Sequence, residues 1–180
     1  MRRQQRAPAR TKVWSLVLAG LILATAGAAA CREEQRMEQE NSPPAAVPNA
    51  APSFRKHGEL VIMSPDNRVK AKLEIEIAES PDELEIGLMG RPTMNSDQGM
   101  LFLFPREDYR SFWMKNTILP LDILFITADM EIATIHADTT PFSEQSYPSS
   151  RPVRYVLEVN AGFARDRDIR TGDRVFWQRM

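Results

Sequence analysis

The chain has 180 residues, of which 43% are hydrophobic and 26% are charged, with 23 Lys and Arg against 24 Asp and Glu. Its single cysteine excludes a framework of disulfides within the chain. It also has no glycine-rich phosphate loop, so the sequence gives no support for nucleotide binding.

Residues 1–30 are typical of a signal peptide. The first 12 residues carry five basic side chains and no acidic one, and an apolar or small-residue run then extends from Val13 to Ala30. The run ends in three alanines, a small-residue cleavage signal. The alternative is an uncleaved transmembrane helix, because roughly 18 residues can just span a bilayer. Both interpretations keep the N-terminus in the cytoplasm and send the rest of the chain across the membrane.

Cys31 follows this run directly, in the place of the lipidated cysteine of bacterial lipoproteins. We therefore expect lipidation at Cys31, with simple cleavage beside it or an uncleaved anchor as alternatives. Lipoproteins usually carry Leu three residues earlier, where this chain has Ala28. Arg32 stands where an aspartate would signal inner-membrane retention, which favours the outer membrane. The expected location is the bacterial cell envelope, facing the periplasm and anchored to the membrane.

Removal of residues 1–30 would make the exported form acidic. It would leave 18 of the 23 Lys and Arg against 24 Asp and Glu, a net charge of about −6. Without a basic stripe, no nucleic-acid partner is expected. Residues 31–57 are rich in Glu, Pro and Ala. Such segments bury too little apolar surface to offset the entropy of ordering, so they predict a disordered tether.

Residues 58–180 predict one domain of mostly β structure. Apolar and charged residues alternate from Val69 to Ile77, as in a half-buried strand. Ser80-Pro81-Asp82-Glu83 has the order of a capping box, which predicts a short helix through Leu88 that ends at Gly90. Further strands are expected at 101–104, 109–114, 121–126, 131–136, 155–160 and 174–177. Many short strands without a βαβ rhythm favour a small closed or barrel-like sheet, antiparallel or mixed, with one or two short helices.

Several short motifs then occur in order along this domain: Gly87-Leu88-Met89-Gly90-Arg91, Gly99-Met100-Leu101-Phe102, Phe112-Trp113-Met114-Lys115-Asn116-Thr117, Pro120-Leu121-Asp122-Ile123, Tyr155-Val156-Leu157-Glu158-Val159 and Gly172-Asp173. Over about residues 60–177 the chain resembles the family catalogued as domain of unknown function 192 (DUF192). The resemblance implies a small, mostly β domain that often follows a signal peptide or lipoprotein signal. One departure is Ala128-Asp129-Met130, where the family commonly has a turn with glycine. The family has no established activity, so the resemblance implies a fold and no reaction.

Candidate site residues lie within otherwise apolar segments. Buried polar groups there need hydrogen-bond partners, so they mark either a ligand site or a structural network, and both interpretations stay open. By strand alternation, Trp113 faces away from Phe112 and would offer a stacking platform for a sugar ring or peptide. The candidates for binding an unknown small molecule, glycan or protein are Arg91, Trp113, Lys115, Asn116, Thr117, Asp122 and Glu158.

Three alternatives to a binding or accessory module remain, of which the last is an assembly or structural domain. One is a hydrolase-type or transferase-type enzyme that uses Lys115 with Asp122 or Glu158; the other interpretation of Lys115 is a salt bridge to one of these acids. The second is a soft-metal (copper) site formed by Met89, Met94, Met100 and Met114, which otherwise fill gaps in the core. The only histidines, His57 and His136, belong to no zinc motif, and no cofactor is expected.

Overall fold

The computed structural model describes residues 53–180. The predicted signal peptide, the lipidation site Cys31 and the predicted tether up to residue 52 lie outside the described residues. Among residues 53–180, no helix has both the length and the apolar character that a membrane span requires.

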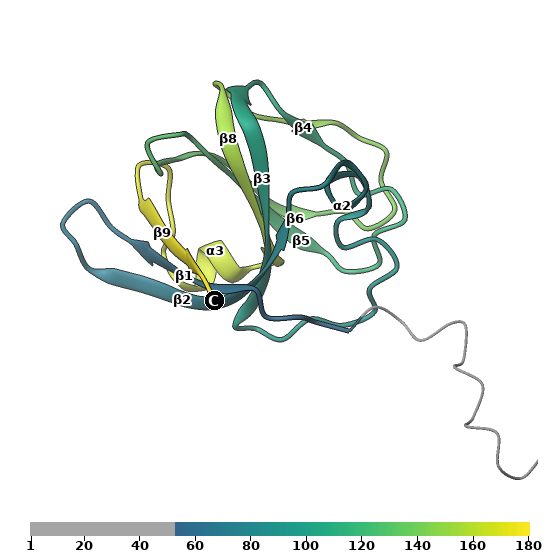
Figure 1. Ribbon diagram of the computed structural model, residues 1–180, viewed down its shortest axis with the longest axis horizontal. Helices are drawn as coiled ribbons and strands as arrows, with labels where there is room; N and C mark the ends of the chain where they lie inside the picture. Colours follow the sequence, from purple (N-terminus) through teal and green to yellow (C-terminus); the bar gives the residue numbers. More distant parts are fainter. Residues whose placement is uncertain (1–52) are drawn as a thin grey trace, which may run out of the picture. The chain divides into compact units, whose positions relative to one another are not determined.

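Seven strands form one mixed sheet with the order β6-β5-β8-β3-β2-β1-β9 (Figure 1). They are β1 (Gly58–Met63), β2 (Val69–Ala78), β3 (Gln98–Asp108), β5 (Leu121–Ile126), β6 (Ile132–Thr139), β8 (Val153–Asn160) and β9 (Arg174–Arg179). A second, two-stranded sheet pairs β4 (Ser111–Phe112) with β7 (Tyr147–Pro148). The helices of the described region are α2 (Pro81–Ile86) and α3 (Phe163–Asp166). The predicted mostly β fold with a mixed sheet and short helices is confirmed.

The sheet is not closed into a barrel, which corrects the stronger form of the prediction. The strands β6 and β9 stand at its two ends. They meet through one isolated bridge, between Glu131 and Arg174. Three backbone hydrogen bonds lie beside it: from the Ile132 N–H to the Asp173 carbonyl at 2.9 Å, from the Gly172 N–H to the Ile132 carbonyl at 2.9 Å, and from the Val175 N–H to the Met130 carbonyl at 2.8 Å. The sheet therefore curls until its ends touch, without a continuous ladder between them.

The prediction that the chain lacks a βαβ unit is wrong at one place. The strands β2 and β3 pair in parallel, and α2 lies between them in the sequence. The helix begins as predicted, with the Ser80 side chain at its N-cap and a reciprocal capping box with Glu83. It ends at Ile86 and is capped by Gly87 rather than Gly90. The helix and both strands were predicted, but that these two strands pair side by side and in parallel is a long-range feature that the sequence pattern does not show.

Three other elements differ from the prediction. The expected strand at 109–114 is reduced to Ser111–Phe112, and β1 and β7 were not predicted as strands. In the turn between β5 and β6, Met130 takes a left-handed φ of 64°. This is the turn in which the resemblance leads one to expect glycine. The turn nevertheless closes tightly, because the Thr127 N–H donates to the Glu131 carbonyl at 2.9 Å.

The central strands are buried on both faces. Alternate residues of β5 belong to two different hydrophobic clusters: Leu124 and Ile126 to the first, Ile123 and Phe125 to the second. Because successive side chains of a strand point to opposite faces, the two clusters lie on opposite sides of the sheet. All six residues of β5 are buried, which explains its continuous apolar run. The face that carries the second cluster also carries the candidate site.

Candidate functional site

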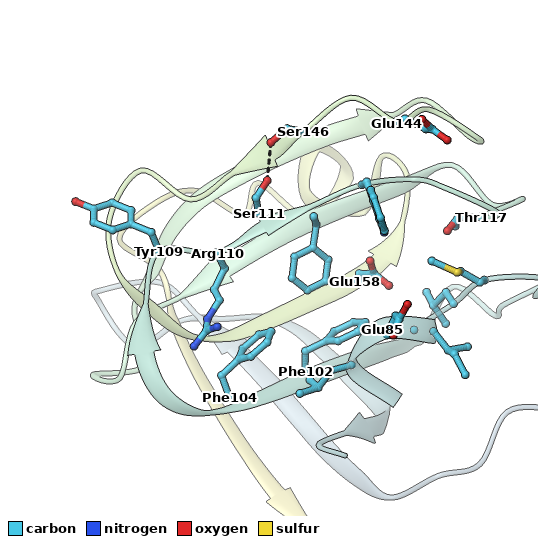
Figure 2. A pocket seen from close by; sticks show the side chains of 17 residues that line it. Glu85, Phe102, Phe104, Tyr109, Arg110, Ser111, Thr117, Glu144, Ser146 and Glu158 are labelled. Atoms are coloured by element: carbon cyan, nitrogen blue, oxygen red, sulfur yellow. Dashed lines mark hydrogen bonds between the residues drawn. The ribbon is translucent and has the colours of Figure 1, made fainter. Parts of the chain in front are cut away.

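A cavity of about 500 Å³ opens on the second face of the sheet (Figure 2). Ligand pockets in proteins commonly have volumes of this order. We call it the aromatic cavity, because five of its lining residues are aromatic: Phe102, Phe104, Tyr109, Phe112 and Trp113. Residues 84–86 of α2 form another part of its wall, and Glu158 of β8 is the one ionisable lining residue that is buried.

The ring of Phe112 connects the walls of the aromatic cavity. It packs edge-to-face on Phe102, Phe104 and Phe125 with ring-centroid distances of 5.0, 6.4 and 5.7 Å. Such pairs are worth about 0.5–1.5 kcal/mol beyond their buried area. A hydrogen bond of 2.6 Å between the hydroxyls of Ser111 and Ser146 joins β4 to the residue before β7 at the rim. These contacts hold the lining side chains in place in the absence of a ligand.

Glu158 lies among apolar neighbours. In the sheet it is paired with Met100 of β3 on one side and Ile123 of β5 on the other. Its side chain is almost fully buried, with 5% of the residue exposed, and burial raises the pKa of its carboxyl to about 8. Among residues 53–180, no side chain or backbone N–H donates a hydrogen bond to this carboxyl or forms an ion pair with it. Figure 2 shows Glu158 near the centre of the lining residues, above Phe102 in this view.

The end of α2 approaches the cavity so closely that only glycine fits at position 87. Gly87 has a left-handed φ of 50°. A Cβ atom there would lie 2.9 Å from the Phe102 ring and 3.7 Å from Oε2 of Glu158. The cap of α2 thus lies directly against the carboxyl and one aromatic wall.

The four candidates from position 113 to 117 follow β4 and lie near the rim. Trp113 lines the cavity and is 46% exposed. The exposed ammonium of Lys115 lies 5.2 Å from the centroid of its ring. Asn116, at a positive φ of 56°, accepts a hydrogen bond on its carbonyl from the Gly90 N–H. Thr117 is buried, donates its N–H to the Met114 carbonyl and lines the cavity.

Asp122 lies on the opposite face of the sheet from Glu158. It has no exposed surface. Its Oδ1 accepts hydrogen bonds from the backbone N–H groups of Asp138 (2.9 Å) and Gly162 (3.1 Å), and its Oδ2 accepts one from Ala164 (2.8 Å). This carboxylate therefore joins the end of β5 to the α3 region and has no place in the aromatic cavity.

Arg91 also lies away from the aromatic cavity. Its Nη2 forms an ion pair of 2.6 Å with Oε2 of Glu76, and both side chains are buried. The other oxygen of Glu76 accepts the Arg55 N–H at 2.7 Å. His57 accepts the Ile77 N–H on Nδ1 at 3.0 Å. Residues 55 and 57, at the end of the predicted tether, thus bond to β2.

The structure brings together Trp113, Thr117 and Glu158 of the candidate residues and leaves Arg91, Lys115, Asn116 and Asp122 outside the lining. In the described part of the chain, Lys115 forms no ion pair with Asp122 or Glu158. The three lining phenylalanines were not predicted as site residues. Their signal in the sequence was the placement of Phe102 and Phe104 two positions apart on one strand, which puts both on the same face.

The four methionines predicted as a possible soft-metal site differ in their surroundings. Met114 is fully buried, and its sulfur lies 3.2 Å from the Thr139 hydroxyl, whose shorter hydrogen bond of 2.8 Å goes to the Leu121 carbonyl. Met100 is buried in the second cluster, and Met94 packs against that cluster. Met89 is the one of the four that lines the aromatic cavity. Within residues 53–180, no group of three or more His, Cys, Asp or Glu side chains is arranged to hold a metal ion.

Comparison with known proteins gives one family and two solved structures. The sequence model of DUF192, described as "Uncharacterized ACR", matches residues 61–177. A crystal structure from Sinorhizobium meliloti 1021, of a protein proposed to be a transcription regulator, is 39% identical with a TM-score of 0.65; the match covers 69% of this chain and 98% of that one. A protein of unknown function from Novosphingobium aromaticivorans DSM 12444 is 34% identical, also with a TM-score of 0.65, and the match covers 74% of this chain and 94% of that one. No curated protein matches the chain.

Proposed function

The chain belongs to the DUF192 family, and from this premise we propose that it is an exported, lipid-anchored protein of the bacterial cell envelope whose β domain binds a ligand in the aromatic cavity. It acts as a binding or accessory module. The observation that carries the proposal is a cavity of about 500 Å³ with aromatic walls and one buried carboxyl that has no partner.

The energetic cost of this arrangement supports a binding role. A buried carboxyl among apolar side chains destabilises the folded state unless it is hydrogen-bonded. Asp122 shows how this sheet satisfies a structural carboxylate, with three backbone donors. Glu158 lacks such donors and faces a cavity instead. A ligand that supplies a hydrogen-bond or ion-pair partner would explain why a buried carboxyl stands at this position.

The location rests on the sequence of residues 1–31. A basic start, an apolar run, three small residues and then Cys31 are the order of a lipoprotein signal. A lipid on Cys31 would anchor the chain, with residues 32–57 as the connection to the domain. The same signal would leave an exported form with a net charge of about −6. For this reason we do not extend to this chain the regulation of transcription proposed for the Sinorhizobium relative.

The anchor is tested by Cys31→Ser in the full chain. We expect the variant to leave the membrane fraction and to lose a radioactive or clickable lipid label. Retention of the variant in the membrane fraction would support the uncleaved transmembrane helix and refute lipidation.

Binding is tested with a fragment library that contains neutral, cationic and anionic ring compounds and simple sugars, by ligand-observed NMR on the purified full chain. We expect at least one class of compound to bind the wild type. Ser146→Trp should abolish this binding, because Ser146 is an exposed residue of the rim and an indole there would fill the entrance.

The matched control is Ser96→Trp, an exposed serine outside the lining. This variant should bind as the wild type does. Binding that survives Ser146→Trp, or a wild type that binds no member of the library, would refute ligand binding in the aromatic cavity.

A further inference from the structure

We infer that the ligand of the aromatic cavity is an organic cation, an ammonium or guanidinium group on an apolar body, with the charge placed against Glu158 and the body between the aromatic side chains. The inference rests on the proposed function and adds to it the chemical class of the ligand. It stands on the position of Glu158, the charge of the lining and the nature of the walls.

The charged residues of the lining are mostly acidic. They are Glu85, Glu144, Glu158 and Arg110. The single cation among them is already engaged, because the Arg110 guanidinium lies 4.2 Å from the centroid of the Phe104 ring and donates from Nη2 to the Arg106 carbonyl at 2.9 Å. In Figure 2, Arg110 lies on the side of Phe104, away from Glu85 and Thr117. The excess of carboxylates attracts a positive ligand and repels an anion.

The walls are suited to the same kind of ligand. Aromatic rings attract cations through their negative faces, most strongly for tryptophan. Two wall residues already show such contacts with the protein's own side chains: Phe104 with Arg110 at 4.2 Å and Trp113 with Lys115 at 5.2 Å. An ammonium near Glu158 would be desolvated on several sides, so it needs the carboxylate as a counter-ion.

Ionisation of Glu158 links this binding to pH. Its pKa of about 8 means that roughly 1% of the carboxyl is ionised at pH 6 and roughly 50% at pH 8. A cation that requires the carboxylate should therefore bind roughly 50-fold more tightly at pH 8 than at pH 6. A neutral ligand that accepts a hydrogen bond from the protonated carboxyl would instead bind about twofold more weakly at pH 8.

The other ionisable groups that line the cavity come from α2 and from the segments around β4 and β7. The paired neighbours on β3 and β5, Met100 and Ile123, carry no ionisable group. The lining groups to be distinguished from Glu158 are Glu85, Tyr109, Arg110 and Glu144.

The test compares benzylammonium with benzyl alcohol on the purified full chain at pH 6, 7 and 8, by isothermal titration calorimetry in buffers of different ionisation enthalpy. Benzylammonium stays protonated over this range, and the alcohol is its neutral counterpart of the same shape. We expect benzylammonium to bind more tightly than the alcohol at pH 8. Its affinity should rise about 50-fold from pH 6 to pH 8, and its binding at pH 6 should release close to one proton. In Glu158→Gln the gain and the proton release should both be lost.

The matched control is Asp129→Asn, which removes an exposed carboxylate in the turn between β5 and β6. It should keep both the affinity and the proton release. Equal binding of the alcohol and the ammonium at pH 8, or proton release that persists in Glu158→Gln, overturns the inference. If the alcohol or an anionic fragment binds and Ser146→Trp blocks it, the binding function stands and only the cationic ligand is refuted.

A parallel titration with N-acetyl-lysine N-methylamide shows whether the positive charge belongs to a protein side chain or to a small molecule. Tighter binding than benzylammonium supports a lysine side chain of a protein partner, and weaker binding supports a free small cation. Both results support an organic cation as the ligand. Failure of both compounds to bind the wild type overturns the inference.

Discussion

Two buried carboxyl groups of this sheet differ in the partners that surround them. Asp122 accepts three backbone hydrogen bonds, whereas Glu158 is paired in the sheet with the apolar residues Met100 and Ile123 and lines a cavity. A carboxylate that accepts hydrogen bonds is stabilised in its charged form, and burial alone disfavours that form. The two residues therefore respond differently to substitution.

Asp122→Ala should lower the free energy of unfolding by about 3 kcal/mol. The reason is that the N–H groups of Gly162 and Ala164 would be left buried without an acceptor, each at a cost of about 1–3 kcal/mol. Urea denaturation followed by circular dichroism measures the change. Asp129→Asn, an exposed control, should stay within about 0.5 kcal/mol of the wild type. A loss as small as that of the control would show that Asp122 does not hold the α3 region.

Glu158→Gln should change the pH dependence of stability. The folded pKa of about 8 lies above the ordinary value of 4.5, so the folded state binds more protons than the unfolded state between these pH values. Stability of the wild type therefore falls as the pH rises from about 4.5 to 8, by up to about 5 kcal/mol from this residue, and then levels off.

The glutamine variant carries no such titration. Relative to the wild type, its free energy of unfolding should be similar at pH 4.5 and clearly higher at pH 8. Urea denaturation at the two pH values measures the difference. Parallel pH profiles of the two proteins would mean that the Glu158 carboxyl is not desolvated.

At the scale of elements, α2 is a helix whose start is set by its local sequence and whose later residues line the cavity. Its capping box holds the first turn, with Oγ of Ser80 accepting the Glu83 N–H and Oε2 of Glu83 accepting the Ser80 N–H. The next turn supplies residues 84–86 of the cavity wall. A weaker cap should therefore loosen one side of the candidate site.

Ser80→Ala should lower the free energy of unfolding by about 1 kcal/mol, the usual value for an N-cap. It should also weaken any ligand that Ser146→Trp excludes, because the wall is less well fixed. Chemical denaturation and the fragment titration measure the two effects. Ser96→Ala, at an exposed serine outside the helices, provides the comparison and should change neither quantity.

Some elements were predictable because their signals are local. The capping box fixed the start of α2, and the alternation from Val69 to Ile77 fixed β2. The run of apolar residues at 121–126 predicted β5, whose bounds match the structure. The strand at 109–114 failed because β4 depends on its partner β7, which lies more than 30 residues later. The helix α2 ends earlier than predicted because Gly87, with a positive φ of 50°, caps it. Gly87 and Gly90 are both glycines that can cap a helix, and the local pattern alone does not choose between them.

The candidate site was only partly predictable for the same reason. Polar residues in an apolar run identified Trp113, Thr117 and Glu158, which share one cavity. The run gave no means of separating Asp122 from Glu158, because the face that each occupies depends on the register of β5 with β8. In that register Ile123 is opposite Glu158, so Asp122 points to the other side.

At the scale of the whole molecule, the curled sheet has one line of weak closure, at the bridge between Glu131 and Arg174. Separation of β6 from β9 there breaks a few backbone hydrogen bonds and exposes the core side chains of Ile132 and Val175, but it leaves every strand pair of the ladder intact. By contrast, β8 pairs with β3 on one side and with β5 on the other. The molecule therefore has a seam that opens at less cost than global unfolding.

Hydrogen exchange makes this seam measurable. The amides of Ile132 and Val175, which donate across it, should exchange with solvent deuterium faster than the amides within β8 and by a route that urea hardly accelerates. Mass spectrometry or NMR of exchanged samples gives the rates. Equal protection of the seam and of β8 would show that the sheet opens only as a whole. If the seam does open first, transient exposure begins at the two edge strands, where Ile132 and Val175 of the first hydrophobic cluster become accessible. The strands that carry Glu158 and the aromatic cavity stay paired.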